Sequence, residues 1–189
     1  MTPPTARSSA RHEAAHAVAA VRLDLPLAYT SIRHGGAGDE SIGPDAQRTA
    51  PPGSKLVSAG HTVLEHGPLA QWVAALPDPQ ARANLERTSV QTAAGIVAEA
   101  KMGATLDDES NRNDLVQLWQ QAATLLGVNF NPADPPPAVR EWCAAQIAEA
   151  DRVLHVDGGA AWDRVMAALL RKKDLSGDEV RALVTEAAH

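Results

Sequence analysis

The sequence predicts a mainly α-helical protein with one short strand region near its start. Most of the chain consists of alanine-rich stretches whose apolar residues recur at helical spacing, between capping residues and glycine or proline stops. Hydrophobic residues make up 44% of the 189 residues but aromatic residues only 3%, so the core consists mainly of Ala, Val and Leu, which suits close-packed helices. Only one early stretch alternates as a strand does.

The first helix is expected to begin just before Arg11, capped by Ser8 or Ser9, and to run to about Leu23. Pro26 ends it. The next residues, "LAYTSIR" at 27–33, favour an extended backbone through their aromatic and β-branched members. Residues 34–54 form a Gly/Pro-rich loop, and residues 56–76 are interpreted as short helices broken near a Gly-Pro pair.

The second half of the chain is predicted to be helical. The expected helices are 78–102 with Gly103 as a stop, 113–126 ended by Gly127, 138–156, 159–172, and a last helix capped by Ser176 with Glu179 completing a capping box. A loop covers 104–113. The segment "NFNPADPPP", 129–137, is a stiff proline-rich linker.

Composition excludes several classes of protein. The formal net charge is −6 without a lysine- or arginine-rich block, which argues against a nucleic-acid partner. A single cysteine, Cys143, excludes an internal disulfide framework and is expected to be a small core residue in a reducing compartment. No apolar run is long enough for a membrane span, and the N-terminus lacks the apolar region of a secretory signal. We therefore expect a cytoplasmic protein that does not span a membrane.

Chemistry is suggested by "HEAAH", residues 12–16. On a helix, His12 and His16 lie one turn apart on one face, where both rings can bind one Zn²⁺. Glu13 lies beside that face and can act as the general base toward a water that zinc acidifies, which then attacks a peptide carbonyl. The alternative is an alanine-rich helix in which these residues occur together by chance.

Catalytic zinc needs a third protein ligand and one open position. Spacing alone does not choose that ligand. The candidates are His34, His61, His66, Asp107, Asp108, Glu99 and Asp114.

Three segments, in order, resemble the FtsH family of ATP-dependent zinc metalloproteases. "HEAAHAVAAVRL" resembles the family's HEAGHAVVA helix. Within 92–122, Gly95, Ala98 and Glu99 match a Gly-Arg-x-Ala-Glu-Glu helix, and "NDL" at 113–115 matches an Ala-Ser-Asn-Asp-Leu helix. Within 151–184, the family's closing pattern is held by Leu169, Leu170, Leu175, Gly177 and Glu179.

The resemblance implies a helical, zincin-like protease domain spanning 1–189, with a zinc-site part at 1–128 and a C-terminal helical bundle at 129–189. It implies that His12, His16 and Asp114 bind zinc and that Glu13 is the general base. Glu99 then supports a ligand or faces the core, unless it is a solvated charge at a helix end.

In the family, a strand beside the active site offers its edge to substrate. The counterpart here is the strand with Tyr29, Thr30, Ser31 and Ile32, whose main chain would pair with an extended peptide. The alternative is a structural strand with no substrate role.

The chain also departs from the family. Ala15 replaces a glycine, the family's Gly-Gly-Arg is reduced to Ala94-Gly95-Ile96, and the 98-residue step from His16 to Asp114 is longer than usual. No membrane anchor and no GxxxxGK[ST] sequence for ATP binding occur. We therefore expect a zinc-dependent endopeptidase that acts on extended or unfolded protein segments without its own ATPase, helped by a separate ATPase or adaptor if one exists. The alternatives are a protease-derived zinc-binding interaction module without peptidase activity and a helical domain without metal.

Overall fold

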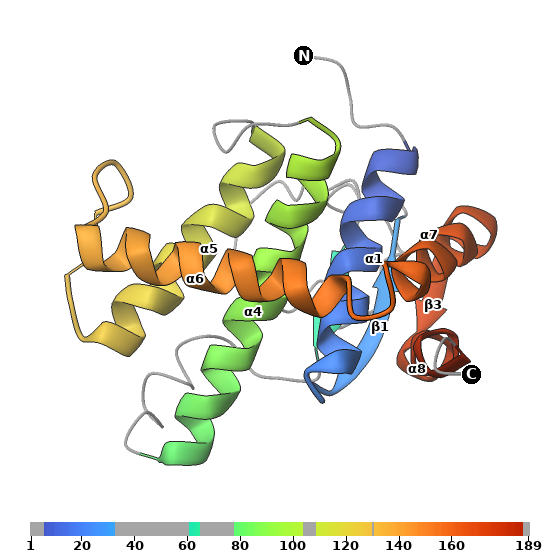
Figure 1. Ribbon diagram of the computed structural model, residues 1–189, viewed down its shortest axis with the longest axis horizontal. Coiled ribbons are helices and arrows are strands. Elements are labelled where there is room, and N and C mark those ends of the chain that lie inside the picture. Colours follow the sequence, from blue (N-terminus) through green and yellow to red (C-terminus); the bar gives the residue numbers. More distant parts are fainter. Residues whose placement is uncertain (1–5, 33–60, 65–77, 104–108, 130, 187–189) are drawn as a thin grey trace, which may run out of the picture.

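The computed structural model describes residues 6–32, 61–64, 78–103, 109–129 and 131–186, and it is mainly helical, as the sequence predicts (Figure 1). The elements in chain order are α1 (Ala6–Arg22), β1 (Leu27–Ser31), β2 (His61–Leu64), α4 (Pro79–Lys101), α5 (Glu109–Leu126), α6 (Pro137–Leu154), α7 (Ala160–Lys172), β3 (Asp174–Ser176) and α8 (Gly177–Thr185).

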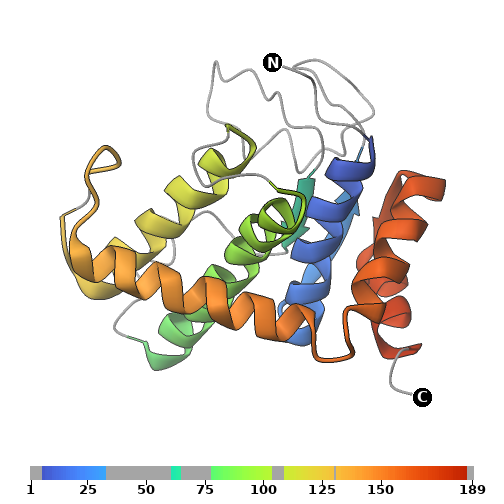
Figure 2. The same cartoon turned by 45° about the horizontal axis from the view of Figure 1, so that its top comes forward.

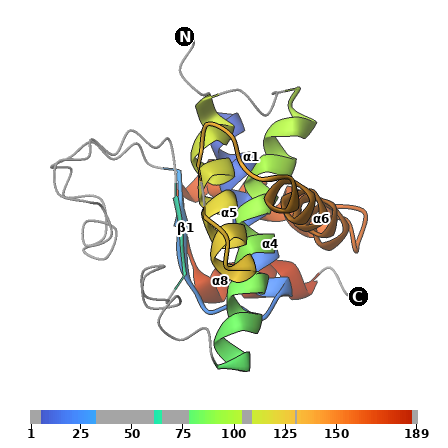
Figure 3. The same ribbon diagram turned by 90° about the vertical axis from the view of Figure 1, so that its left-hand side faces the viewer.

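The three strands form one antiparallel sheet in the order β2-β1-β3. Tyr29 lies opposite Val63 of β2 on one side and opposite Ser176 of β3 on the other. In the side view of Figure 3, β1 and β2 lie to one side of α1, α4 and α5. The sheet therefore joins the beginning of the chain to its end.

Three local predictions were wrong. Residues 61–64 form a strand, whereas short helices were expected across 56–76; the rest of that range lies outside the described residues. The strand β3 was not foreseen. Helix α5 begins at Glu109, so 109–113 are helical where a loop was expected. Both missed strands are only three or four residues long and pair with β1, which is distant in sequence, so no local pattern reveals them.

Caps set the helix ends that the sequence did predict. The side chain of Asp78 accepts a hydrogen bond from the backbone N–H of Gln80 at 3.0 Å, and Pro79 occupies the first turn of α4. Ser176 and Glu179 form the predicted capping box of α8. Gly103 (φ 85°) and Gly127 (φ 66°) follow α4 and α5 in the left-handed region, where a side chain is strained.

Helix α1 is the centre of the core. Its alanines Ala10, Ala14 and Ala17 have no exposed surface, and the helix packs against α4 and α7. Helix α4 packs in turn against α5 and α6. Figure 2 shows α5, α4, α1 and α7 beside one another, with α6 crossing over α5 and α4. Small side chains allow close approach of these helices, and this arrangement brings residues of α1, α4 and α5 to one place.

The residues after the proline-rich linker belong to the same core as those before it. Helix α6 packs on α4 and α5, whereas α7 packs on α1 and α8, so the C-terminal helices pack against the helices that precede the linker. Arg22, at the end of α1, pairs with Asp157 at 2.8 Å and donates to the carbonyl oxygens of Val153 and Leu154 at the end of α6. This contact fixes α1 against the α6–α7 connection.

The expected burial of the single cysteine is confirmed. Cys143 is 3% exposed in the core, and burial raises the pKa of its thiol to about 11, which leaves it unreactive. Among the residues that the structure describes, no helix has both the length and the apolar character that crossing a membrane requires.

Candidate metal centre

Helices α1 and α5 bring His12, His16 and Asp114 together. The Nε2 atoms of the two histidines are 3.1 Å apart. Asp114 Oδ2 lies 3.1 Å from Nε2 of His16 and 3.3 Å from Nε2 of His12. Within the described ranges, this is the one group of three or more such side chains close enough to share a metal ion. It is the ligand set that the sequence resemblance implies.

The triangle of ligand atoms has the size that tetrahedral zinc requires. Zinc lies about 2.0–2.1 Å from imidazole nitrogen and carboxylate oxygen, so tetrahedral ligand atoms are about 3.3–3.4 Å apart. The three separations here, 3.1, 3.1 and 3.3 Å, are close to that value. The side chains of His12 and Asp114 remain 15% and 16% exposed, so the described residues do not close the triangle off from solvent. These residues therefore fit a metal ion, and among the described residues nothing seals His12 and Asp114 from solvent.

Helix α4 contacts the other nitrogen of each ring. Nδ1 of His16 lies 2.8 Å from the carbonyl oxygen of Gln91, to which it donates a hydrogen bond as the Nδ1–H tautomer. Nδ1 of His12 lies 3.2 Å from Oε1 of Glu99, at ion-pair distance but without the alignment of a hydrogen bond. An acceptor beside each Nδ1 favours the proton there and leaves both Nε2 lone pairs available to a metal. Glu99 thus lies where a residue that supports a ligand is expected.

The charges of the cluster stabilise one another. Burial opposes protonation of His12, but contacts with Asp114 and Glu99 outweigh it and raise the pKa of His12 well above its ordinary value. The pKa of His16 is raised as well, because Asp114 outweighs the effect of burial. Burial alone would raise the pKa of Asp114, but the two histidines lower it far below its usual range. Asp114 is therefore ionised and attracts positive charge, whether a proton on a ring or a metal ion.

Glu13 lies within the same turn of α1 and is only 5% exposed. Its carboxylate raises the pKa of both His12 and His16, which places its charge close to the two rings. A buried carboxylate beside a metal centre, on the helix that supplies two ligands, is the arrangement in which a general base acts on water.

The structure contradicts the predicted substrate role of the strand edge at 29–32. Tyr29, Thr30 and Ser31 of β1 pair with both β2 and β3, and the N–H of Ile32 donates to the carbonyl of Lys173 at 2.9 Å. Because β1 is the middle strand, its main-chain groups pair with β2 and β3 within the sheet. Neither edge of β1 is therefore free to pair with a peptide.

The remaining candidates for the third ligand are not part of this cluster. Four of them lie outside the described residues: His34, His66, Asp107 and Asp108. His61 belongs to β2, where its backbone is opposite Ser31.

The sequence did not predict the contact of Gln91 with His16. It is made by a backbone carbonyl, so residue type carries no signal for it. The four-residue spacing of 91, 95 and 99 along one helix face was the available clue.

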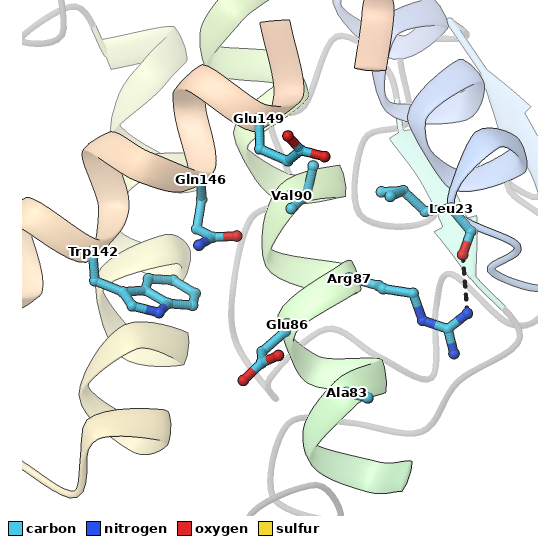
Figure 4. A pocket seen from close by; sticks show the side chains of 8 residues that line it. All are labelled: Leu23, Ala83, Glu86, Arg87, Val90, Trp142, Gln146 and Glu149. Carbon is cyan, nitrogen blue, oxygen red and sulfur yellow. Dashed lines mark hydrogen bonds between the residues drawn. The ribbon is translucent and has the colours of Figure 1, made fainter. Parts of the chain in front are cut away.

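A groove of about 470 Å³ lies elsewhere, between α4, α6 and the end of α1 (Figure 4). Arg87 donates across it to the carbonyl oxygen of Leu23 at 3.1 Å. Its two carboxylates, Glu86 and Glu149, each pair with an arginine of their own helix. None of the metal-centre residues lines this groove.

Fold and site together define a mainly helical protein with a two-histidine, one-aspartate group that could hold a metal ion. No model of a protein family matches the chain, and a search of curated proteins finds no significantly similar sequence.

Proposed function

We propose that the protein is a zinc-dependent endopeptidase that hydrolyses peptide bonds in extended or unfolded protein segments. The observation that carries the proposal is the triangle of His12, His16 and Asp114, at zinc-compatible distances, with the buried Glu13 beside it. The resemblance of helix α1 and of residues 92–122 to the FtsH proteases points to the same activity.

Different residues of the chain have different roles in the proposed reaction. Zinc, when bound, lowers the pKa of water and polarises a carbonyl oxygen. The Gln91 carbonyl and Glu99 orient the rings of His16 and His12, so that both Nε2 atoms face the same point. Glu13 takes the proton from the attacking water and later returns it to the leaving amine.

The proposed substrate is an extended segment, because the FtsH family unfolds its substrates with ATP and no GxxxxGK[ST] sequence occurs within these 189 residues. A separate ATPase or adaptor would be needed to deliver folded proteins. The negative net charge makes a nucleic-acid partner unfavourable. The single buried cysteine fits a reducing compartment such as the cytoplasm.

The test is cleavage of an unfolded protein, such as casein, without ATP. Zinc-loaded protein should cut it, a chelator should stop cleavage, and added zinc should restore it. Asp114→Ala, which lacks the third ligand, should be inactive under all three conditions. Cleavage that persists in excess chelator, or in Asp114→Ala, would contradict the proposal.

One observation favours the second candidate, a zinc-binding module that acts through protein contacts without peptidase activity. Both edges of β1 are occupied, so the strand expected to hold a substrate does not offer its main chain. This candidate predicts a protein that binds zinc stoichiometrically but leaves every unfolded substrate intact.

A further inference from the structure

Gly95 lies against the metal centre from the side of α4. A Cβ atom at this position would be 2.2 Å from Asp114 Oδ2, 2.4 Å from His16 Nε2 and 2.7 Å from His12 Cε1. Non-bonded atoms do not approach so closely. The three side chains can meet as they do only because residue 95 has no side chain.

Residues 91, 95 and 99 share one face of α4 because they are four residues apart. The carbonyl of Gln91 holds His16, and the carboxylate of Glu99 lies beside His12, one turn away on either side of Gly95. Helix α4 therefore contacts both rings, and between these two contacts Gly95 has no side chain that would keep the ligand atoms away from the helix.

The ligand side chains occupy the space that a side chain at residue 95 would fill. An ion bound to all three atoms is about 2.0–2.1 Å from each. A Cβ at 2.2 Å from Asp114 Oδ2 and 2.4 Å from His16 Nε2 would displace these atoms from the positions in which they can share an ion. Glycine inside a helix is destabilising relative to alanine, and Gly95 lies well inside the 23-residue α4. The metal centre supplies the reason for a glycine here.

We propose that Gly95 is a positioning residue of the metal centre: it provides no ligand, but its missing side chain lets the three ligand side chains come close enough together to share one ion. This inference rests on the proposed zinc site, though not on peptidase activity. Any side chain at 95 closes the centre to metal even when all three ligands are present.

The test compares zinc binding by wild type and Gly95→Ala, through the zinc retained after dialysis and the affinity in competition with a chromophoric chelator. Wild type should retain one zinc per chain. Gly95→Ala should lose more than the roughly 10–100-fold in affinity that follows removal of an outer partner of a ligand. Ala100→Gly changes the same helix by one methyl group at an exposed position and should bind as wild type does.

Two results would overturn the inference in different ways. If Gly95→Ala binds zinc as tightly as wild type, the inference is wrong while the proposed zinc site stands. If wild type itself binds no zinc, the inference and the proposed function both fail.

A second comparison covers the case in which Gly95→Ala does not fold. In a His12→Ala/His16→Ala/Asp114→Ala background, the three side chains nearest to the added methyl group are gone. Adding Gly95→Ala there should leave the melting temperature unchanged or raise it, because alanine favours the helix. A lower melting temperature would show that the methyl group clashes with something other than the ligands, and the inference would be abandoned.

Discussion

Zinc affinity should rise with pH, and it should keep rising above neutral pH. The rings of His12 and His16 must lose their protons to bind metal, so protons and zinc compete for the same nitrogens. A free histidine has a pKa of about 6.5, and a site built from such residues gains little affinity above pH 7. Here Asp114 and Glu99 raise the pKa of His12, and Asp114 raises that of His16, so competition extends to higher pH.

The size of the effect follows from the number of protons displaced. Release of one to two protons changes the affinity by about 10–100-fold per pH unit, or roughly 1.4–2.7 kcal/mol of binding free energy. Asp114 adds nothing in this range, because its pKa is lowered and it is already ionised.

The metal-free protein should show the opposite trend. A raised histidine pKa stabilises the fold below about pH 6.5, and this contribution is lost as pH rises through the raised pKa values. The difference in melting temperature between zinc-loaded and metal-free protein should therefore widen with pH. Chelator competition and thermal unfolding between roughly pH 6 and pH 9 measure both trends. An affinity that is level above pH 7 would refute the assignment of these rings as ligands coupled to Asp114.

Two further substitutions separate the metal centre from the fold. Glu99→Gln should weaken zinc binding about 10–100-fold, because it removes the negative charge beside Nδ1 of His12. The free energy of unfolding should barely change. An unchanged zinc affinity would show that Glu99 does not support the ligand. Arg22→Ala should lower the free energy of unfolding by about 1.5–3 kcal/mol in chemical denaturation, because Asp157 and two helix-end carbonyls lose a largely buried charged donor. Its zinc affinity should stay that of wild type, and a parallel loss of zinc would show that the α1–α6 contact also shapes the centre.

The helices were predictable where a local signal marks their ends. The starts of α4 and α8 are predicted by Asp78-Pro79 and by the Ser176–Glu179 pair, because capping depends on residues only two or three positions apart. The start of α5 was missed, since Asp, Asn and Ser in 107–113 read as a loop. The packing of α5 on α4 outweighs that weak local preference.

Two of the three proposed ligands could be predicted from local spacing in the same way. His12 and His16 are related by one helical turn, but Asp114 reaches them only through the packing of α1, α4 and α5, so spacing left seven candidates open. The edge position of β1 was wrongly predicted for a related reason. Whether a strand lies at an edge depends on its partner strands, and neither β2 nor β3 was predicted from the sequence. The space beneath Gly95 is a property of packed helices and has no sequence signal beyond the glycine itself.

The most direct test of the proposed function is the Glu13→Gln variant. Glutamine has nearly the shape of glutamate but cannot take a proton, so the variant should keep the fold and bind one zinc per chain. Cleavage of an unfolded protein should fall by about 10²–10⁴-fold, the usual contribution of a general base. Zinc-loaded Glu13→Gln that cuts as fast as zinc-loaded wild type would contradict the account.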